Sequence, residues 1–218
     1  MIQAVIFDLD GVLVDTAHYH FIAWKRLAEE LGINFTEREN ESLKGVSRMR
    51  SLEIILQHGN LRLPTEEMEI LATKKNSWFV EYIHTMKPTE IFPGVKELLQ
   101  NLRAGGLKVG LASSSKNADA VLNLLDIKNY FDTIVDGTMI THTKPDPEIF
   151  LLAAKRLSIP ANQCLIFEDA EAGVEAALAA GMKCVGVGSV EQLGKADLVI
   201  EKTGDFKMEQ LQFLNAKH

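Results

Sequence analysis

Cysteine is scarce in this chain, which has only Cys164 and Cys184 among its 218 residues. The two form no CxxC motif and define no disulfide framework, so we expect both to be buried as small apolar side chains. Such thiols fit a reducing cytoplasm best. Because a chain of this length buries roughly 70% of its unfolded surface, it needs neither a disulfide nor a structural metal to fold.

Long apolar runs and an excess of basic residues are also absent. No run approaches the ~18–20 apolar residues of a membrane span, and residues 1–8 lack the basic region that opens a signal peptide. The formal net charge is −7, and no basic stripe of the kind that binds nucleic acid is visible. With 46% apolar and 24% charged residues, the composition is that of a globular protein. We therefore expect a cytoplasmic protein that binds neither membranes nor nucleic acid.

Short apolar runs alternate with helical patterns through most of the chain. The runs typical of buried parallel strands are residues 3–9, 107–112, 133–135, 163–167, 183–187 and 198–200. Apolar residues three or four positions apart predict helices near 95–102, 121–125, 149–157 and 172–180. This alternation predicts an α/β fold, with helices on both faces of a parallel sheet.

Residues 15–91 show helical periodicity and no convincing strand, with helices expected near 21–31, 51–57 and 65–86. A crossover between parallel strands usually needs about a dozen residues, whereas this block has ~75. We therefore expect residues 1–14 and 92–218 to form the core, and residues 15–91 to form an inserted helical domain.

Polar residues follow the predicted strands at the edge of the sheet where ligands bind in open α/β folds. Asp8 and Asp10 end the first strand and point the same way, so one could act as a nucleophile and the other as a general acid/base. Ser113 opens a run of hydroxyl residues before a helix, an arrangement that suits a phosphate. The ordinary alternatives are solvated turn aspartates and a simple helix cap.

Two further strand ends carry charged residues. Lys144 lies in a loop before a helix that a proline opens. Glu168 and Asp169 directly follow a buried strand, where carboxylates suit a hard cation such as Mg²⁺. A solvated lysine and a helix cap at Asp169 are the alternatives. Polar groups of complementary chemistry at all these strand ends favour a single site.

In order and separation, these residues resemble the four motifs of the haloacid dehalogenase-like phosphotransferases. The matching residues are Asp8-Leu9-Asp10-Gly11-Val12, Ser113, Lys144-Pro145 and Glu168-Asp169. The resemblance covers nearly the whole chain. It implies a Rossmann-like catalytic core with a helical cap domain inserted after the first strand.

The same resemblance implies a role for each site residue. Asp8 would be the nucleophile that becomes an aspartyl phosphate, and Asp10 the general acid/base. Mg²⁺ would be held by Asp8, the backbone carbonyl of Asp10, Asp169 and Glu168. Substrate would be bound by Thr16, His20, Trp24, Lys44, Gly45, Val46, Ser47, Arg48, Lys75, Ser113, Ser114, Ser115, Lys116, Asn117 and Lys144. Trp24 could equally be part of ordinary helix packing.

The reaction implied is a mutase reaction that interconverts β-D-glucose 1-phosphate and glucose 6-phosphate through β-glucose 1,6-bisphosphate. The alternative is a Mg²⁺-dependent sugar-phosphate phosphatase on the same scaffold. Residues 44–48 favour the mutase because Arg48 could hold a second phosphate. A non-catalytic phosphate-binding protein and a dehalogenase fit the intact set of acids less well. We expect sugar phosphates as the only partners and, without an evident assembly motif, a monomer.

Overall fold

The computed structural model describes residues 1–43 and 46–216. The chain divides into two compact units, one made of Met1–Asp15 and Lys87–His218 and the other of Thr16–Met86. The sequence places the ends of the insertion at residues 15 and 91. The second boundary differs because Ile91 forms an antiparallel bridge with Val14 and so joins the first unit.

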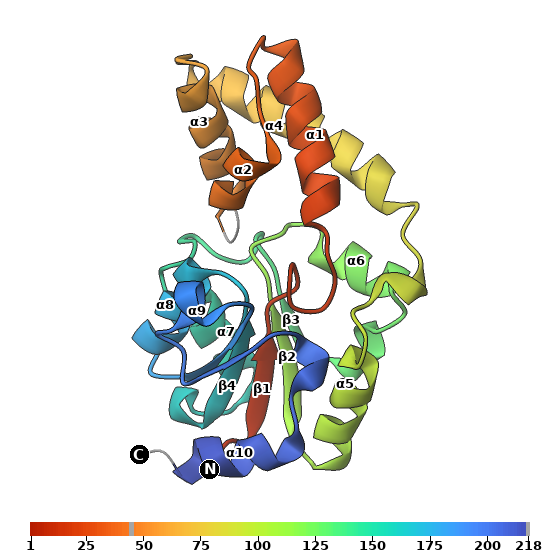
Figure 1. Cartoon of the computed structure of the whole chain (residues 1–218), viewed down its shortest axis with the longest axis vertical. Helices are drawn as coiled ribbons and strands as arrows, with labels where there is room; N and C mark the ends of the chain where they lie inside the picture. The colour runs from red at the N-terminus through yellow and green to blue at the C-terminus, as the bar shows by residue number, and fades with distance from the viewer. Residues whose placement is uncertain (44–45, 217–218) are drawn as a thin grey trace. The chain divides into compact units, whose positions relative to one another are not determined.

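A parallel sheet with the strand order β3-β2-β1-β4-β5-β6 forms the centre of the first unit (Figure 1). Its strands are β1 (Ala4–Phe7), β2 (Lys108–Ala112), β3 (Thr133–Val135), β4 (Cys164–Glu168), β5 (Lys183–Val187) and β6 (Leu198–Ile200). All five neighbouring pairs are parallel. The predicted strands and fold class are therefore confirmed.

Both faces of this sheet are covered. The helices of the unit are α5 (Val95–Ala104), α6 (Ala118–Leu124), α7 (Glu148–Leu157), α8 (Glu171–Ala179), α9 (Val190–Leu193) and α10 (Met208–Ala216). On one face, Ile6 of β1 shares a core with Phe150 of α7. On the other face, the ring of Phe7 lies 4.8 Å from that of Phe167, which in turn contacts Phe206. Burial on both faces explains why the strands read as continuous apolar runs.

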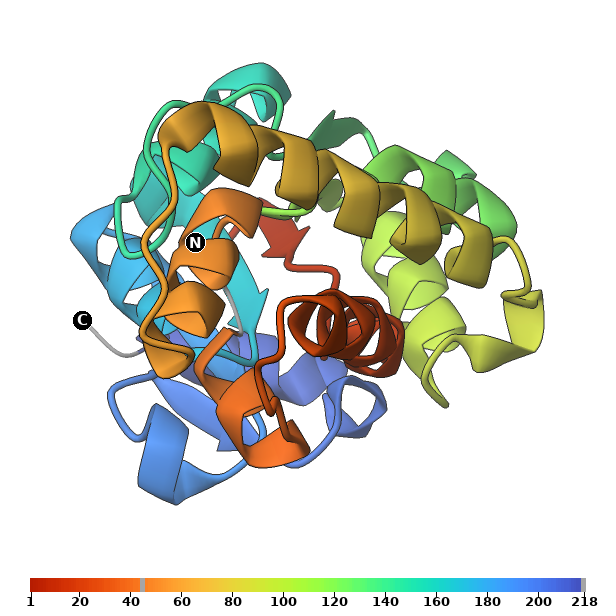
Figure 2. The same cartoon turned by 90° about the horizontal axis from the view of Figure 1, so that it is seen from above.

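The second unit is helical, and no strand occurs among its described residues. It contains α1 (Ala17–Glu30), α2 (Glu37–Asn40), α3 (Arg48–His58) and the 19-residue α4 (Thr65–Ile83), drawn in gold in Figure 2. Helix α4 packs against both α1 and α3. Leu27, Leu52 and Phe79 are fully buried in this unit. Within the part of the chain that the structure describes, no helix has the length and apolar character needed to cross a membrane.

Candidate active site

The candidate site lies at the carboxyl edge of the central strands. Strand β1 pairs with β2 on one side and β4 on the other, and Phe7 is level with both Leu111 and Phe167. Asp8, which follows β1, and Glu168, the last residue of β4, therefore reach the same edge. The structure thus brings together polar groups from segments far apart in the sequence.

Lys144 joins the acids of two strand ends. Its Nζ lies 2.5 Å from Oδ1 of Asp8 and 2.7 Å from Oε2 of Glu168. Nζ also lies 3.5 Å from the carbonyl oxygen of Ala112 and 5.0 Å from the centre of the Phe150 ring. The relative exposures are 3% for Lys144, 6% for Asp8 and 0% for Glu168, so this cluster of charges is withdrawn from water.

Burial and the neighbouring charges shift the pKa values of Lys144 and Glu168. Burial alone would lower the pKa of Lys144, but the carboxylates of Asp8 and Glu168 raise it above its ordinary value. Burial raises the pKa of Glu168 to about 7, Lys144 opposes this effect, and the negative charge of Asp8 adds to it. Lys144 is thus a permanent cation beside Asp8, which is what a group that stabilises a phosphoryl transfer must be.

Three carboxylates of this edge form a possible site for a divalent metal. Asp8, Glu168 and Asp169 each offer an oxygen, and these oxygens lie within 4.8 Å of one another. Carboxylate oxygens are the ligands that hard divalent cations prefer, so the donor set fits such an ion. A Cβ atom at Gly11 would lie 2.0 Å from Oδ2 of Asp169, so the absent side chain leaves room for that carboxylate.

Asp10 lies beside Asp8 on the outer side of the cluster. Its backbone N–H donates to Oδ2 of Asp8 at 3.0 Å, and the residue is partly exposed. The N–H donor orients the Asp8 carboxylate, whereas the Asp10 side chain retains access to solvent. A general acid/base must reach a substrate oxygen, and that role stays a prediction for Asp10.

Three serines and a lysine make up the loop after β2, where the sequence predicts that a phosphate binds. Ser113 is 1% exposed, and its Oγ accepts the N–H of Ser115 at 3.1 Å. The Oγ of Ser115 accepts the N–H of Asn117, the residue before α6, at 3.2 Å. Ser114 and Ser115 are partly exposed and Lys116 is exposed. Hydroxyl groups and a lysine therefore precede α6 in the structure, and phosphate binding by this loop stays a prediction.

Several of the remaining predicted residues form one cluster within the helical unit. Nζ of Lys75, a residue of α4 that is 2% exposed, lies 2.7 Å from Nδ1 of His20 on α1. The His20 ring stacks on Phe79 at 4.0 Å, and Nζ of Lys75 lies 4.4 Å from the centre of the Trp24 ring. Trp24 is 2% exposed, so it supports Lys75 from within the packed interface of α1 and α4.

The other predicted residues of this unit lie at helix ends. Thr16 precedes α1, is fully buried, and its carbonyl oxygen accepts the N–H of His20 at 3.0 Å. Ser47 caps α3 by accepting the N–H of Arg50 at 3.3 Å. Arg48 begins α3 and is partly buried, and this burial lowers its pKa. Val46 is partly buried. Lys44 and Gly45 lie outside the described residues.

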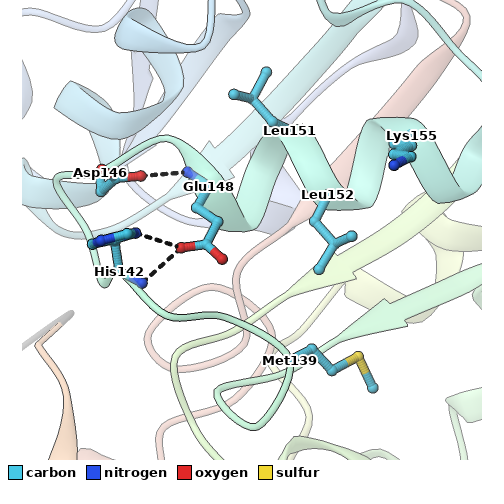
Figure 3. A pocket seen from close by; sticks show the side chains of 7 residues that line it. All are labelled: Met139, His142, Asp146, Glu148, Leu151, Leu152 and Lys155. Atoms are coloured by element: carbon cyan, nitrogen blue, oxygen red, sulfur yellow. Dashed lines mark hydrogen bonds and ion pairs between the residues drawn. The ribbon is translucent and has the colours of Figure 1, made fainter.

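An open pocket beside α7 lies next to the loop that carries Lys144. It is lined by Met139, His142, Asp146, Glu148, Leu151, Leu152 and Lys155 (Figure 3). The Glu148 carboxylate accepts the backbone N–H groups of Thr141 and His142 at 3.0 and 2.6 Å, and Asp146 accepts the N–H of Glu148 at 2.9 Å. The two backbone donors lower the pKa of Glu148. These groups hold the start of α7, and so support the Lys144 loop.

The sequence analysis did not single out Asp136 and Gly137, two residues that follow β3 at the same edge of the sheet. Asp136, which follows β3, is 8% exposed and accepts the N–H of Thr138 at 2.8 Å. Gly137 lies so close to the serine loop that a Cβ atom there would be 2.2 Å from the carbonyl oxygen of Ser114. The sequence signal that could have identified them is an acid followed by glycine directly after a predicted strand.

Comparison with known proteins agrees with this architecture. The sequence pattern of the haloacid dehalogenase-like hydrolases matches residues 5–187. A β-phosphoglucomutase of Bacillus subtilis is 46% identical over 211 residues, which are 96% of this chain and 93% of that protein. A phosphorylated carbohydrates phosphatase of Thermotoga maritima is 35% identical over 207 residues, covering 91% of this chain and 90% of that protein.

A solved structure extends the comparison to three dimensions. The crystal structure of a β-phosphoglucomutase from Clostridium difficile superposes with a TM-score of 0.95 at 46% identity. The match covers 98% of this chain and 96% of that chain. The chain belongs to the haloacid dehalogenase-like hydrolase family.

Proposed function

We propose that this protein is a β-phosphoglucomutase, which interconverts β-D-glucose 1-phosphate and glucose 6-phosphate. The observation that carries the proposal is the 46% identity to the Bacillus subtilis mutase across 96% of the chain, which spans the core and the helical unit alike. The buried pair of Asp8 and Lys144 supports the same chemistry, since their 2.5 Å contact places a nucleophile beside a fixed cation.

The reaction starts with a phosphoryl group on Asp8. The 6-hydroxyl of β-glucose 1-phosphate attacks that phosphorus atom, so the bond from phosphorus to the sugar oxygen forms, the bond from phosphorus to Asp8 breaks, and Asp10 takes the hydroxyl proton. Asp8 then attacks the phosphorus atom at C1 of the resulting bisphosphate. The bond from that phosphorus to the C1 oxygen breaks, Asp10 returns the proton to this oxygen, and glucose 6-phosphate leaves with Asp8 phosphorylated again.

The remaining groups of the core supply positive charge and orientation. Lys144 balances the charge that develops on the phosphoryl oxygens, and Ser113 with the loop up to Asn117 donates hydrogen bonds to them. Bound Mg²⁺, held by Asp8, Asp169, Glu168 and the Asp10 carbonyl, would supply further positive charge there. The net charge of −7 makes such local cations necessary for an anionic substrate.

In the helical unit, Arg48 is the residue proposed to bind the distal phosphate of the bisphosphate. A guanidinium group can form two parallel hydrogen bonds to phosphate oxygens. Residues 44–47 and Lys75 complete the sugar subsite in this proposal. Cys164 and Cys184 are free, buried thiols, which supports a reducing location such as the cytoplasm. We also expect the protein to be a monomer.

One assay tests the proposal against the phosphatase alternative that the Thermotoga maritima relative represents. The enzyme receives β-glucose 1-phosphate, Mg²⁺ and a glucose bisphosphate primer, and glucose 6-phosphate and free phosphate are followed together. A mutase forms glucose 6-phosphate in large excess over phosphate. Release of phosphate as the main product would identify a phosphatase instead.

A pair of arginine variants tests the distal site. Arg48→Ala should weaken the use of sugar phosphate about ten- to hundredfold, since a charged hydrogen bond contributes about 1.5–3 kcal/mol. Hydrolysis of acetyl phosphate, which has no second phosphate, should stay unchanged. Arg50→Ala is the matched control because Arg50 is exposed and pairs with Glu53 at 2.8 Å. Equal losses on both substrates in Arg48→Ala would remove Arg48 from the site.

A further inference from the structure

Gly173 occupies a helical position that its backbone does not require to be glycine. It lies in the first turn of α8, is buried, and its N–H donates to the carbonyl oxygen of Ala170 at 3.0 Å. Its φ lies outside the left-handed region that favours glycine. In an ordinary helical conformation, glycine is less favourable than alanine. The reason for glycine must therefore lie in the surroundings of residue 173.

Those surroundings are the side chain of Glu168. A Cβ atom at residue 173 would lie 2.0 Å from Cδ, 2.3 Å from Oε2 and 2.4 Å from Cγ of Glu168. Real Cβ atoms essentially never approach other atoms closer than 3.0 Å. An alanine at this position would consequently displace the carboxyl group.

The Glu168 carboxyl is buried, and both of its oxygens have a partner. The residue is 0% exposed, its Oε2 lies 2.7 Å from Nζ of Lys144, and its Oε1 accepts the N–H of Ala170 at 3.1 Å. Lys144 in turn lies 2.5 Å from Asp8. Displacing the Glu168 carboxyl would therefore disturb the cation beside the nucleophile.

We propose that Gly173 is a positioning residue, which leaves the volume that the Glu168 carboxyl occupies and so keeps Lys144 in place against Asp8. The effect on turnover rests on the proposed function, whereas the steric effect does not. Gly11 has a similarly close contact with Asp169, but its φ of +76° requires glycine for the backbone as well. At Gly173, space alone selects glycine.

The first test is turnover by Gly173→Ala at saturating substrate and Mg²⁺. We expect a loss of about 100-fold, because a misplacement of about 1 Å at a reacting centre costs roughly that factor. The apparent affinity for Mg²⁺, measured by calorimetric titration without substrate, should fall as well. Gly105→Ala is the matched control: it ends α5 on the surface, and the nearest atoms to its Cβ position are 3.4 Å away. It should change neither quantity.

The second test separates this steric role from a general packing role, and it uses urea unfolding without metal or substrate. Gly173→Ala is made in the natural sequence, in Glu168→Ala and in Glu168→Gln. Glu168→Ala removes the atoms that would clash, whereas Glu168→Gln keeps a side chain of the same size. We expect Gly173→Ala to lower the unfolding midpoint in the natural protein and in the Glu168→Gln background. In the Glu168→Ala background it should raise the midpoint, because the new methyl group fills the cavity.

Each outcome decides the proposal. If Gly173→Ala alone fails to fold, folding of the double variant with Glu168→Ala supports it. Equal destabilisation by Gly173→Ala in all three backgrounds would overturn it, as would unchanged turnover and stability in the natural background. A further outcome is that the protein fails the mutase assay while Gly173→Ala still lowers the unfolding midpoint of the natural protein and raises that of Glu168→Ala. In that case the steric inference stands and the proposed function is wrong.

Discussion

Nζ of Lys75 lies 2.7 Å from Nδ1 of His20, and the His20 ring stacks on Phe79. An ammonium group can only donate hydrogen bonds, so the imidazole must accept with an unprotonated Nδ1. Burial first, and then the positive charges of Lys75 and Arg48, hold the pKa of His20 well below its ordinary value. The folded helical unit therefore keeps a neutral histidine.

This neutral histidine predicts a pH dependence of stability. The unfolded chain binds a proton at His20 below about pH 6.5, the ordinary histidine pKa, and the folded chain does not. The contribution of His20 to the free energy of unfolding is present above that pH and falls as the pH drops through it. His20→Gln should flatten this slope between about pH 5 and pH 8.

Urea unfolding followed by tryptophan fluorescence measures the effect, because both tryptophans, Trp24 and Trp78, belong to the helical unit. His58→Gln is the control, since His58 is exposed and lies 3.8 Å from Glu39. A slope that His20→Gln leaves as steep as in the natural protein would contradict the assignment.

Lys144→Met should abolish turnover and destabilise the core. The substitution keeps an unbranched side chain but leaves Asp8 and Glu168 buried without their cation. Removing one partner of a buried ion pair costs about 3–5 kcal/mol. Lys155→Met, on the exposed side of α7, should change the free energy of unfolding by less than about 0.5 kcal/mol. Metal-free urea unfolding of the two variants compares them, and equal stabilities would show that the Lys144 cluster does not hold the core together.

Asp10→Asn should lower turnover by about 10²–10⁴-fold, the usual contribution of a general acid/base. The backbone carbonyl proposed to bind Mg²⁺ is kept and the backbone N–H of residue 10 still donates to Asp8, so the affinity for Mg²⁺ should persist. Asp8→Asn serves as the reference for complete loss, with no trapped phosphoenzyme. A collapse of Mg²⁺ affinity in Asp10→Asn would instead make Asp10 a structural residue of the metal site.

Removal of divalent metal with a chelator should stop turnover, and Mg²⁺ should restore it. Because a ligand that binds only the folded state stabilises it, Mg²⁺ should also raise the thermal unfolding midpoint. Asp169→Asn should reduce this rise, whereas Asp205→Asn, at an exposed position, should preserve it. Full activity in the presence of the chelator would exclude a metal requirement.

Strands and site acids are predictable because their signals are local. Thr133–Val135 and Lys183–Val187 are apolar runs whose bounds in the structure equal the predicted ones. Asp8 and Glu168 directly follow such runs, so the sheet edge fixes their neighbourhood. Helices α8 and α10 both segregate apolar from polar residues only weakly, but the alanine-rich sequence of α8 predicts a helix and α10 lacks that signal.

Contacts between distant segments are the part that sequence reasoning could not supply. Lys144 is separated from Asp8 by 136 positions, and nothing local indicates that it bridges Asp8 and Glu168. Likewise, the face of Trp24 that supports Lys75 depends on how α1 meets α4. Such contacts depend on how different helices and strands pack together. The residue pattern within one helix or strand does not indicate them.

The segments that enter and leave the helical insertion are hydrogen-bonded to each other at one point of the core. Val14 bridges Ile91, and the N–H of Phe92 donates to the carbonyl oxygen of Leu13 at 2.9 Å. An insertion whose ends already meet adds little loop-closure entropy to the host, whatever its length. Because these contacts lie within the core, the two ends of residues 16–86 meet at a fixed point next to β1. A change of length inside the helical unit should therefore leave the register of β1 and the acids that follow it unchanged.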